Sequence, residues 1–308
     1  MISSPLLSLT EAPAAALVQA FLAGRNPRTL AAYRTDLAAF AAFLGAVNAE
    51  GAAWMLLTRA AGEANQVALA WRASMVERGL AAATVNRRLA AVRSMVKLAR
   101  TLGLVAWVIE VEGVEAQPYR DTRGPGAAGW QRIRAAATTR TDPKGLRDLA
   151  LLRLLHDMAL RRGEVAGLDM EHLDLAGARL AVLGKGRTGR EWLTVPAQTL
   201  ASLAAWLNAR GSQPGPLFTS FDRAGKGSGR ITGAGMFSVV RAAGDAAGVK
   251  VRPHGLRHAG ITAALDATGG NIRKVQRYSR HRDMRTLEIY DDSRQDMAGE
   301  VAALVAAG

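Results

Sequence analysis

The stretch 173-LDLAGARLAVLGKGRTGREWLTVP-196 is where the spacing of apolar residues changes along the chain. On both sides of it, apolar residues recur at the three- and four-residue spacing of helices. Inside it, the short runs 178–183 and 191–196 flank the glycine-rich turn 184–190, which is typical of two antiparallel strands. We therefore predict a mainly α fold with a small β-sheet.

The first 105 or so residues are predicted to be almost wholly helical. The stretch 26-NPRTLAAYRTDLAAFAAFLG-45 has apolar residues at helical spacing and ends at Gly45, a natural helix stop. The clearest helix lies within 82-AATVNRRLAAVRSMVKLARTLGLV-105, and Thr84 is its predicted N-cap. Its apolar stripe comprises Val85, Leu89, Val92, Val96 and Ala99.

Composition narrows the range of functions. The 308 residues carry a formal net charge of +14 and contain no cysteine. The charge favours a polyanionic partner, most often nucleic acid, although a GC-rich genome that favours Arg would give the same bias. The missing cysteines exclude disulfides, zinc thiolate sites and thiol nucleophiles. No run of 18 apolar residues occurs, so we predict no membrane span and no membrane partner. The missing cysteines fit a reducing cytoplasm, and we predict a cytoplasmic, nucleoid-associated protein.

Residues 111–127 break the helical pattern, since they are charged, aperiodic and contain Pro and Gly. We interpret them as a linker between an N-terminal helical DNA-binding domain, 1–110, and a C-terminal α+β domain, 128–308. The basic side chains of the 82–105 helix form either a solvated face or a surface along phosphates, and the net charge favours phosphates. The candidate DNA contacts on this helix are Arg87, Arg88, Arg93 and Lys97.

Polar residues in the second domain lie at the edges of predicted elements. Arg161 ends an apolar helical run, and its planar guanidinium suits bidentate hydrogen bonding to a phosphate. Glu164 follows three residues later and is placed to brace that guanidinium. Lys185 lies at the tip of the predicted hairpin, where it can swing into a groove. A surface ion pair and an exposed hairpin lysine are the simpler interpretations of these residues.

The stretch 252-RPHGLRHAGIT-262 places His254 and Arg257 on one face of a helix if Pro253 opens that helix. Histidine and arginine together suit acid–base or phosphate chemistry. A metal site formed by His254 and His258 is disfavoured, because the motif has no glutamate or cysteine and an arginine lies between the imidazoles. His258 is the better candidate for a satisfied core histidine.

In 280-RHRDMRTLEIYDD-292, arginines surround His281, and Tyr290 follows that histidine by nine residues. A lone tyrosine in a basic helix is most often ordinary packing. However, a basic environment lowers the free energy of a phenolate and attracts phosphate, so the alternative interpretation of Tyr290 is a nucleophile.

The order Arg, Lys, His-x-x-Arg, His, Tyr resembles that of the tyrosine recombinases, the phage-integrase family of site-specific recombinases, in a compact Xer-like two-domain form. ALRRGEVAGLDMEHLDL (159–175) resembles the family's GLRxSELLxLxxxDID, and LGKGRTGREWLTVP (183–196) resembles GKGxKxRxVP. HGLRHAGIT (254–262) resembles HDLRHTFAT, and YSRHRDMRTLEIYDD (278–292) resembles LGHxxxxTTxxYxH. The first domain is similar to the family's helical core-binding domain. Ala159 and Arg280 depart from the pattern, because each stands where the family usually has Gly.

The resemblance implies a role for each matching residue. Tyr290 would attack a scissile DNA phosphate, forming a 3′-phosphotyrosyl bond and releasing a 5′-hydroxyl. The other catalytic residues would be Arg161 and Arg257 as phosphate clamps, Lys185 as general acid, and His254 and His281 as aids to proton transfer. Glu164 and His258 would support them, and Arg190, Arg280 and Arg282 would contact DNA. The resemblance implies no cofactor: neither metal nor ATP is needed.

The resemblance also implies partners. One partner is double-stranded DNA. The other is the protein itself, as a homotetramer on two DNA sites with a Holliday junction as intermediate. When free of DNA, the protein would be weakly associated or monomeric. The apolar segment 297–308 would pack either into a neighbouring protomer or onto its own domain. Two alternatives stay open: a type IB topoisomerase-like enzyme of related chemistry, and a catalytically silent DNA-binding protein.

Overall fold

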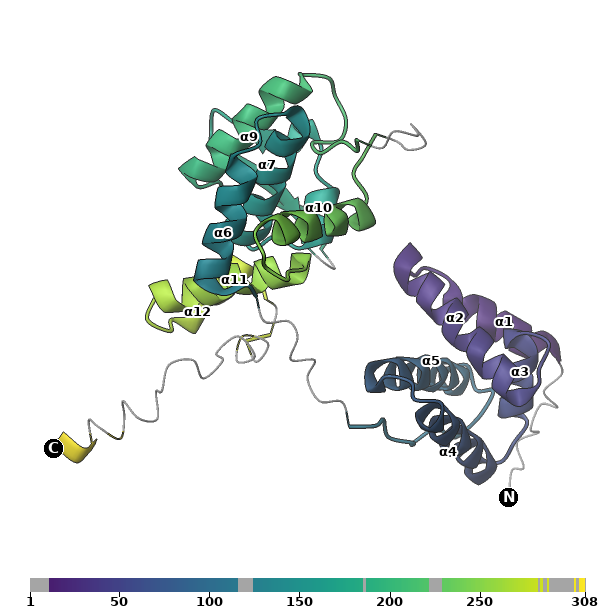
Figure 1. The fold of residues 1–308 in the computed structure, drawn as a ribbon. Coiled ribbons are helices and arrows are strands. Elements are labelled where there is room, and N and C mark those ends of the chain that lie inside the picture. Colours follow the sequence, from purple (N-terminus) through teal and green to yellow (C-terminus); the bar gives the residue numbers. More distant parts are fainter. Residues whose placement is uncertain are drawn as a thin grey trace. The chain divides into compact units, whose positions relative to one another are not determined.

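The computed structural model describes residues 11–115, 124–184, 187–221, 229–281, 283–284, 287, 302 and 305–307. The chain divides into two compact units, Met1–Tyr119 and Arg120–Gly308, whose elements are labelled in Figure 1. The predicted fold class is confirmed, since the described residues form helices and one small sheet. The domain limits at residues 110 and 128 stay a proposal. The residues Lys185, Arg282 and Tyr290, and most of 297–308, lie outside the described residues.

The first unit is helical throughout its described elements. These are α1 (Glu11–Leu22), α2 (Pro27–Leu44), α3 (Ala49–Leu57), α4 (Ala61–Glu77) and α5 (Ala82–Thr101). The predicted stop of α2 is confirmed, because Gly45 has the left-handed backbone (φ 68°) that glycine adopts without steric cost. The predicted N-cap Thr84 is wrong: Ala81 holds the cap position, and α5 begins at Ala82. The high helix propensity of Ala82 and Ala83 extends the helix ahead of the threonine.

The core of the first unit gathers around the predicted apolar stripe of α5. Every member of that stripe, from Val85 to Ala99, is at most 1% exposed. Phe40 of α2 and Trp71 of α4 pack with ring centroids 4.7 Å apart. After α5, the chain is held by two asparagines: Asn65 accepts from the N–H of Glu110, and Asn86 bonds both backbone groups of Val114 at 2.8 and 2.9 Å.

No single helix among the described residues is long and apolar enough to cross a membrane. One pair, Thr29–Leu44 with Ala49–Leu57, reaches the required length and composition only when its two helices are taken together, and they meet at a bend of 61°. Leu37 and Phe40 of this pair lie in the unit's core, at 1% and 0% exposure.

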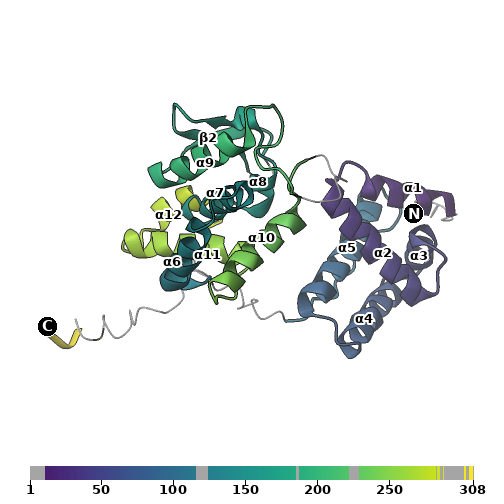
Figure 2. The ribbon, with the colours of Figure 1, turned by 45° about the horizontal axis from the view of Figure 1, so that its top comes forward.

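The second unit packs helices around a central helix, α7. Figure 2 shows α6, α9, α10 and α11 arranged about α7, with β2 beside α9. The elements before the sheet are α6 (Gly126–Thr138), α7 (Pro143–Asp157) and α8 (Arg162–Ala166). The strands are β1 (Leu173–Asp174), β2 (Arg179–Leu183) and β3 (Arg190–Thr194). The helices after it are α9 (Ala197–Arg210), α10 (Gly233–Ala246), α11 (Pro253–Ala267) and α12 (Ile272–Ser279).

The sheet confirms the predicted hairpin and adds a short third strand. Its order is β1-β2-β3, and both pairs are antiparallel. Leu180 pairs with Leu193, and Val182 pairs with Glu191. Leu180 and Val182 are buried, whereas Trp192 on the outer strand β3 is 51% exposed. The sheet therefore presents β2 to the core.

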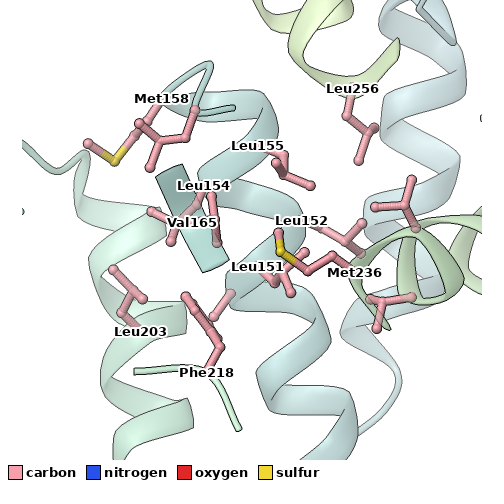
Figure 3. Packing of buried hydrophobic residues seen from close by; sticks show 14 of the residues in the cluster. Leu151, Leu152, Leu154, Leu155, Met158, Val165, Leu203, Phe218, Met236 and Leu256 are labelled. Atoms are coloured by element: carbon pink, nitrogen blue, oxygen red, sulfur yellow. The ribbon is translucent and has the colours of Figure 1, made fainter. Parts of the chain in front are cut away.

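The core of the second unit is built on the leucines of α7, which point to several sides of that helix. Figure 3 shows Leu151, Leu152, Leu154 and Leu155 directed to different neighbours, among them Leu203 of α9 and other labelled side chains. All four leucines are 0% exposed. Leucines on several sides of one helix need several neighbours to cover them, and here the surrounding helices do so. The carboxyl end of α7 is therefore held firmly, and the candidate site begins there.

Candidate active site

The chain turns sharply after α7 and places Arg161 at the start of α8. Ala159 has a left-handed backbone (φ 45°), and Arg161 is the extended residue before α8. The side chain of Arg161 is 32% exposed. Its guanidinium is thus open to solvent on one side and anchored on the other.

Glu164 provides that anchor. One carboxylate oxygen accepts from the guanidinium of Arg161 and the other from its backbone N–H, each at 2.8 Å. The second oxygen also accepts from Arg280 at 2.9 Å. Burial alone would raise the pKa of Glu164, but the N–H of Arg161 and the charges of Arg280 and Arg161 outweigh it and lower that pKa. Glu164 is therefore a carboxylate at neutral pH, bound to two arginines.

Helix α11 supplies His254 and Arg257 on one face, and Pro253 is in its first turn, as predicted. The helix approaches the end of α7 closely at Gly260. A Cβ atom built on Gly260 would lie 2.1 Å from the backbone oxygen of His156, so only glycine fits there. This approach brings Arg257 within reach of the turn after α7.

Arg257 is buried, at 2% exposure, and joins three segments. Its guanidinium donates to the carbonyl of Ala159 and, at 2.6 Å, to the carbonyl of Ser279. It also lies 3.4 Å from Nε2 of His281. A buried guanidinium is stable only when its donors are paired, and these carbonyls pair them. Arg257 therefore fixes the end of α7 against the end of α12, beside His281.

The turn after α12 is built on Arg280, which has a left-handed backbone (φ 57°, ψ 39°) and donates its N–H to Gln276 at 2.8 Å. A residue other than glycine in this conformation costs about 1 kcal/mol. Its side chain is 7% exposed and bonds Glu164, so it points inward. The inward direction of this side chain disfavours the predicted DNA contact by Arg280. The turn orients His281, whose Nδ1 lies 2.9 Å from the hydroxyl of Ser279.

Both site histidines are neutral at pH 7. Burial, followed by the charges of Arg257 and Arg161, lowers the pKa of His281 from 6.5 to about 4. Loss of surrounding water, then the same two arginines, also lowers the pKa of His254, although that residue lies at the surface. Because the unfolded chain binds the His281 proton more tightly, His281 makes the fold less stable as pH falls from about 6.5 towards 4.

The structure thus brings four of the six predicted catalytic residues together: Arg161, His254, Arg257 and His281. Of the two supporting residues, Glu164 joins them directly. His258 is 2% exposed, and its ring lies 3.4 Å from the hydroxyl of Thr262 on its own helix. Arg190 lies at the start of β3 and contacts the carbonyl of Gly167 at 3.4 Å.

Sequence reasoning missed two parts of this arrangement: the hydroxyl of Ser279 and the carbonyl of Ala159. The sequence did contain a signal for the role of the Ala159 carbonyl, because Ala159 and Arg280 both stand where the resembling motifs have Gly. A glycine in a motif often marks a left-handed backbone, and both residues do have positive φ. Ser279 had only its closeness to His281 in the sequence.

Comparison with known proteins identifies the family. The profile of the phage integrase family matches residues 130–297, and that of the phage integrase N-terminal SAM-like domain matches residues 20–101. A tyrosine recombinase of Synechococcus elongatus is 41% identical over 286 residues, which make up 90% of this chain and 88% of the relative. The chain belongs to the phage integrase family of tyrosine recombinases. A tyrosine recombinase of Synechocystis is 40% identical over 249 residues, 79% of each chain.

The fold of the recombinase is also found among solved structures. A crystal structure of a lambda integrase tetramer bound to a Holliday junction gives a TM-score of 0.65 and covers 91% of this chain and 78% of that one. The sequences are 13% identical, so the likeness concerns the fold.

The basic side chains of helix α5 in the recombinase differ in how far they are engaged by other residues. Arg87 and Arg88 are engaged by the buried carboxylate of Asp36 on α2, with N–O distances of 2.5 and 3.9 Å. Burial raises the pKa of Asp36, and the two arginines only partly offset it. Arg93 is half-buried and Lys97 is exposed. Lys97 is therefore the predicted contact on α5 that has most freedom to meet a phosphate.

Lys97→Ala tests whether α5 lies along DNA. Each phosphate contact contributes about one unit to the slope of log K against log salt concentration, so we expect that slope to fall by about 1. Lys144→Ala in the second unit removes the same charge from an exposed residue of α7 and is the matched control. Equal slopes for the wild type and both variants, in titrations of a DNA duplex, would exclude α5 as a DNA-facing helix.

Proposed function

We propose that this recombinase cuts and rejoins DNA at a specific site through a 3′-phosphotyrosyl intermediate, with Tyr290 as the nucleophile. One observation supports this most: Arg161, His254, Arg257 and His281 converge from distant segments, and Glu164, which bonds Arg161, is also bound by a second arginine, Arg280. Such a group is suited to a phosphodiester, because its positive charge is not cancelled and its histidines are neutral.

The proposed reaction assigns each group a task. The phenol oxygen of Tyr290 attacks phosphorus, a P–O bond to the tyrosine forms, and the P–O5′ bond breaks. Lys185 gives a proton to the leaving 5′-oxygen, while the neutral rings of His254 and His281 accept or relay the phenolic proton. The partly exposed Arg161 donates hydrogen bonds to a nonbridging oxygen, and the buried Arg257 adds positive charge from the protein interior. A phosphodiester is exchanged for another, so the proposal needs neither ATP nor a metal.

The assembly is part of the same proposal. Four protomers would bind two DNA sites and exchange strands through a Holliday junction. The support is the fold shared with the lambda integrase tetramer bound to such a junction. The protein free of DNA would be monomeric or weakly associated.

Covalent capture on DNA tests the nucleophile. The recombinase is incubated with sheared DNA of its host, protein-linked fragments are trapped with detergent, and their ends are sequenced to find the site. A nicked suicide duplex carrying that site is then expected to accumulate adduct with the wild type and none with Tyr290→Phe, because phenylalanine has no nucleophilic oxygen. An adduct that forms equally with Tyr290→Phe would contradict the assignment.

Tyr278→Phe is the matched control. The hydroxyl of Tyr278 donates to the carbonyls of His156 and Asp157 at 3.0 and 3.1 Å, and burial raises its pKa, so it is a structural phenol. Its replacement should leave adduct formation intact. Incubation of the wild type with DNA that carries two paired sites then distinguishes the alternatives. A branched junction supports recombination, and relaxation of supercoils without a junction supports a type IB topoisomerase-like enzyme. Binding without any adduct supports a silent DNA-binding protein.

A further inference from the structure

Arg280 has an unfavourable left-handed backbone although it is not a glycine, and its side-chain contacts offer a physical reason for this. It lies at the end of α12, where its φ of 57° is a left-handed value. Its guanidinium reaches Glu164 at 2.9 Å and makes longer contacts with the carbonyls of Met158 at 3.5 Å and Ala159 at 3.4 Å. With 7% of the side chain exposed, it is directed to the interior beneath the site.

Both principal acceptors of Arg280 are shared with the clamp arginines. Glu164 accepts from the guanidinium of Arg161 through one oxygen and from the guanidinium of Arg280 through the other. The carbonyl of Ala159 accepts from Arg257 and from Arg280. We infer that Arg280 is a positioning residue that fixes Arg161 and Arg257 relative to each other by sharing one acceptor with each.

This sharing also sets the charge presented to a phosphate. A buried Glu164 paired with Arg161 alone would cancel the charge of that guanidinium almost entirely. With Arg280 as a second partner, the group of three carries one net positive charge, and Arg161 is its most exposed member at 32%. Arg280 therefore keeps Arg161 electrostatically active while Glu164 holds it in place.

The inference rests on the proposed function for its effect on rate, and Arg280→Gly isolates that effect. Glycine accepts the left-handed backbone, so the variant removes the side chain without adding strain. We expect single-turnover cleavage to fall about 10- to 100-fold, with DNA affinity and its salt slope unchanged. Arg280→Lys keeps the charge but not the planar fork and should give an intermediate rate. Arg241→Ala, on the exposed face of α10, is the charge-matched control.

A double-mutant cycle with Glu164→Gln gives the sharper result. Glutamine is neutral and leaves the charge of Arg161 uncancelled, so Arg280→Gly should cost less than about 3-fold in that background. Equal losses in both backgrounds would overturn the inference. A weaker affinity and smaller salt slope at an unchanged cleavage rate would do so too, because they would mark Arg280 as a DNA contact.

A readout without DNA separates this inference from the proposed function. Among the described residues, the charged and titratable groups that act on the pKa of His281 include Arg257 and His254 of α11, Arg161 before α8, and Arg280 in its own turn. Removing the Arg280 charge should shift the midpoint of the His281 ring titration upwards in NMR, and the full chain has only five histidines to assign. An unchanged midpoint in the folded Arg280→Gly protein would contradict the inference, whereas Arg280→Lys keeps the charge and should shift the midpoint less. Absence of adduct with the wild type would instead contradict the proposed function alone.

Discussion

Arg161→Ala is expected to reduce the single-turnover rate of DNA cleavage about 100- to 1000-fold, the usual loss when one donor to a developing oxyanion is removed. The fold should survive, because Arg280 still pairs the buried carboxylate of Glu164 after Arg161 is gone. The measurement is the rate of adduct formation on the suicide duplex at saturating protein, so that a change in DNA affinity does not affect the measured rate.

Arg162→Ala is the matched control for that experiment. Arg162 is the next residue, is exposed, and has the same charge, yet it makes no hydrogen bond to Glu164 in the described part of the chain. Its loss should change the cleavage rate by less than about 3-fold, since surface charges away from a site contribute little. Similar losses in both variants would show that the region needs positive charge and that the placement of Arg161 is unimportant.

Gly260→Ala is expected to destabilise the catalytic unit by about 3 kcal/mol, the upper part of the range for an overpacked core. The added Cβ atom would lie 2.1 Å from the backbone oxygen of His156, which cannot rotate away as a side chain would. For a unit of this size, that loss corresponds to a melting temperature lower by about 6–12 °C in calorimetry.

The control for this prediction is Gly62→Ala in α4, where a Cβ atom meets nothing within 4 Å. That variant should melt no lower than the wild type, because alanine favours helix over glycine. If Gly260→Ala also melts at the wild-type temperature, α11 does not pack against α7 at this point, and the placement of Arg257 described above is wrong.

Local patterns in the sequence were sufficient to predict the helices and the hairpin. Pro253 and Gly45 act on their own neighbours in the chain, so their effects on α11 and α2 could be predicted without knowing the fold. Thr84 shows the limit of such reasoning, because two alanines ahead of it prolonged the helix by one turn. The sheet strand β1 has only two residues and leaves no periodic signal.

The candidate site could be predicted as a set of residues but not as a network. Arg161 and Glu164 are three residues apart, so their pairing follows from sequence. Arg280 lies 116 residues from Glu164, and its inward direction depends on packing between α12 and the end of α7. The partnership of Arg87 with Asp36, 51 residues away, was hidden for the same reason. Tertiary contacts of this kind place Arg280 in the interior and pair the exposed Arg87 with a buried carboxylate, and neither outcome changes the local sequence pattern.

The leucines of α7 have a consequence for synthesis of the protein on the ribosome. Helix α7 ends at Asp157, but α11, one of the helices that cover it, is complete only at Ala267, 110 residues later. At ordinary rates of translation this interval is about 5–20 s, during which the leucine surface of α7 has no complete cover. The nascent chain should therefore be a substrate for ribosome-associated chaperones between these two lengths. Crosslinking of stalled chains of increasing length should show chaperone contacts that begin after α7 emerges and end once α11 has emerged.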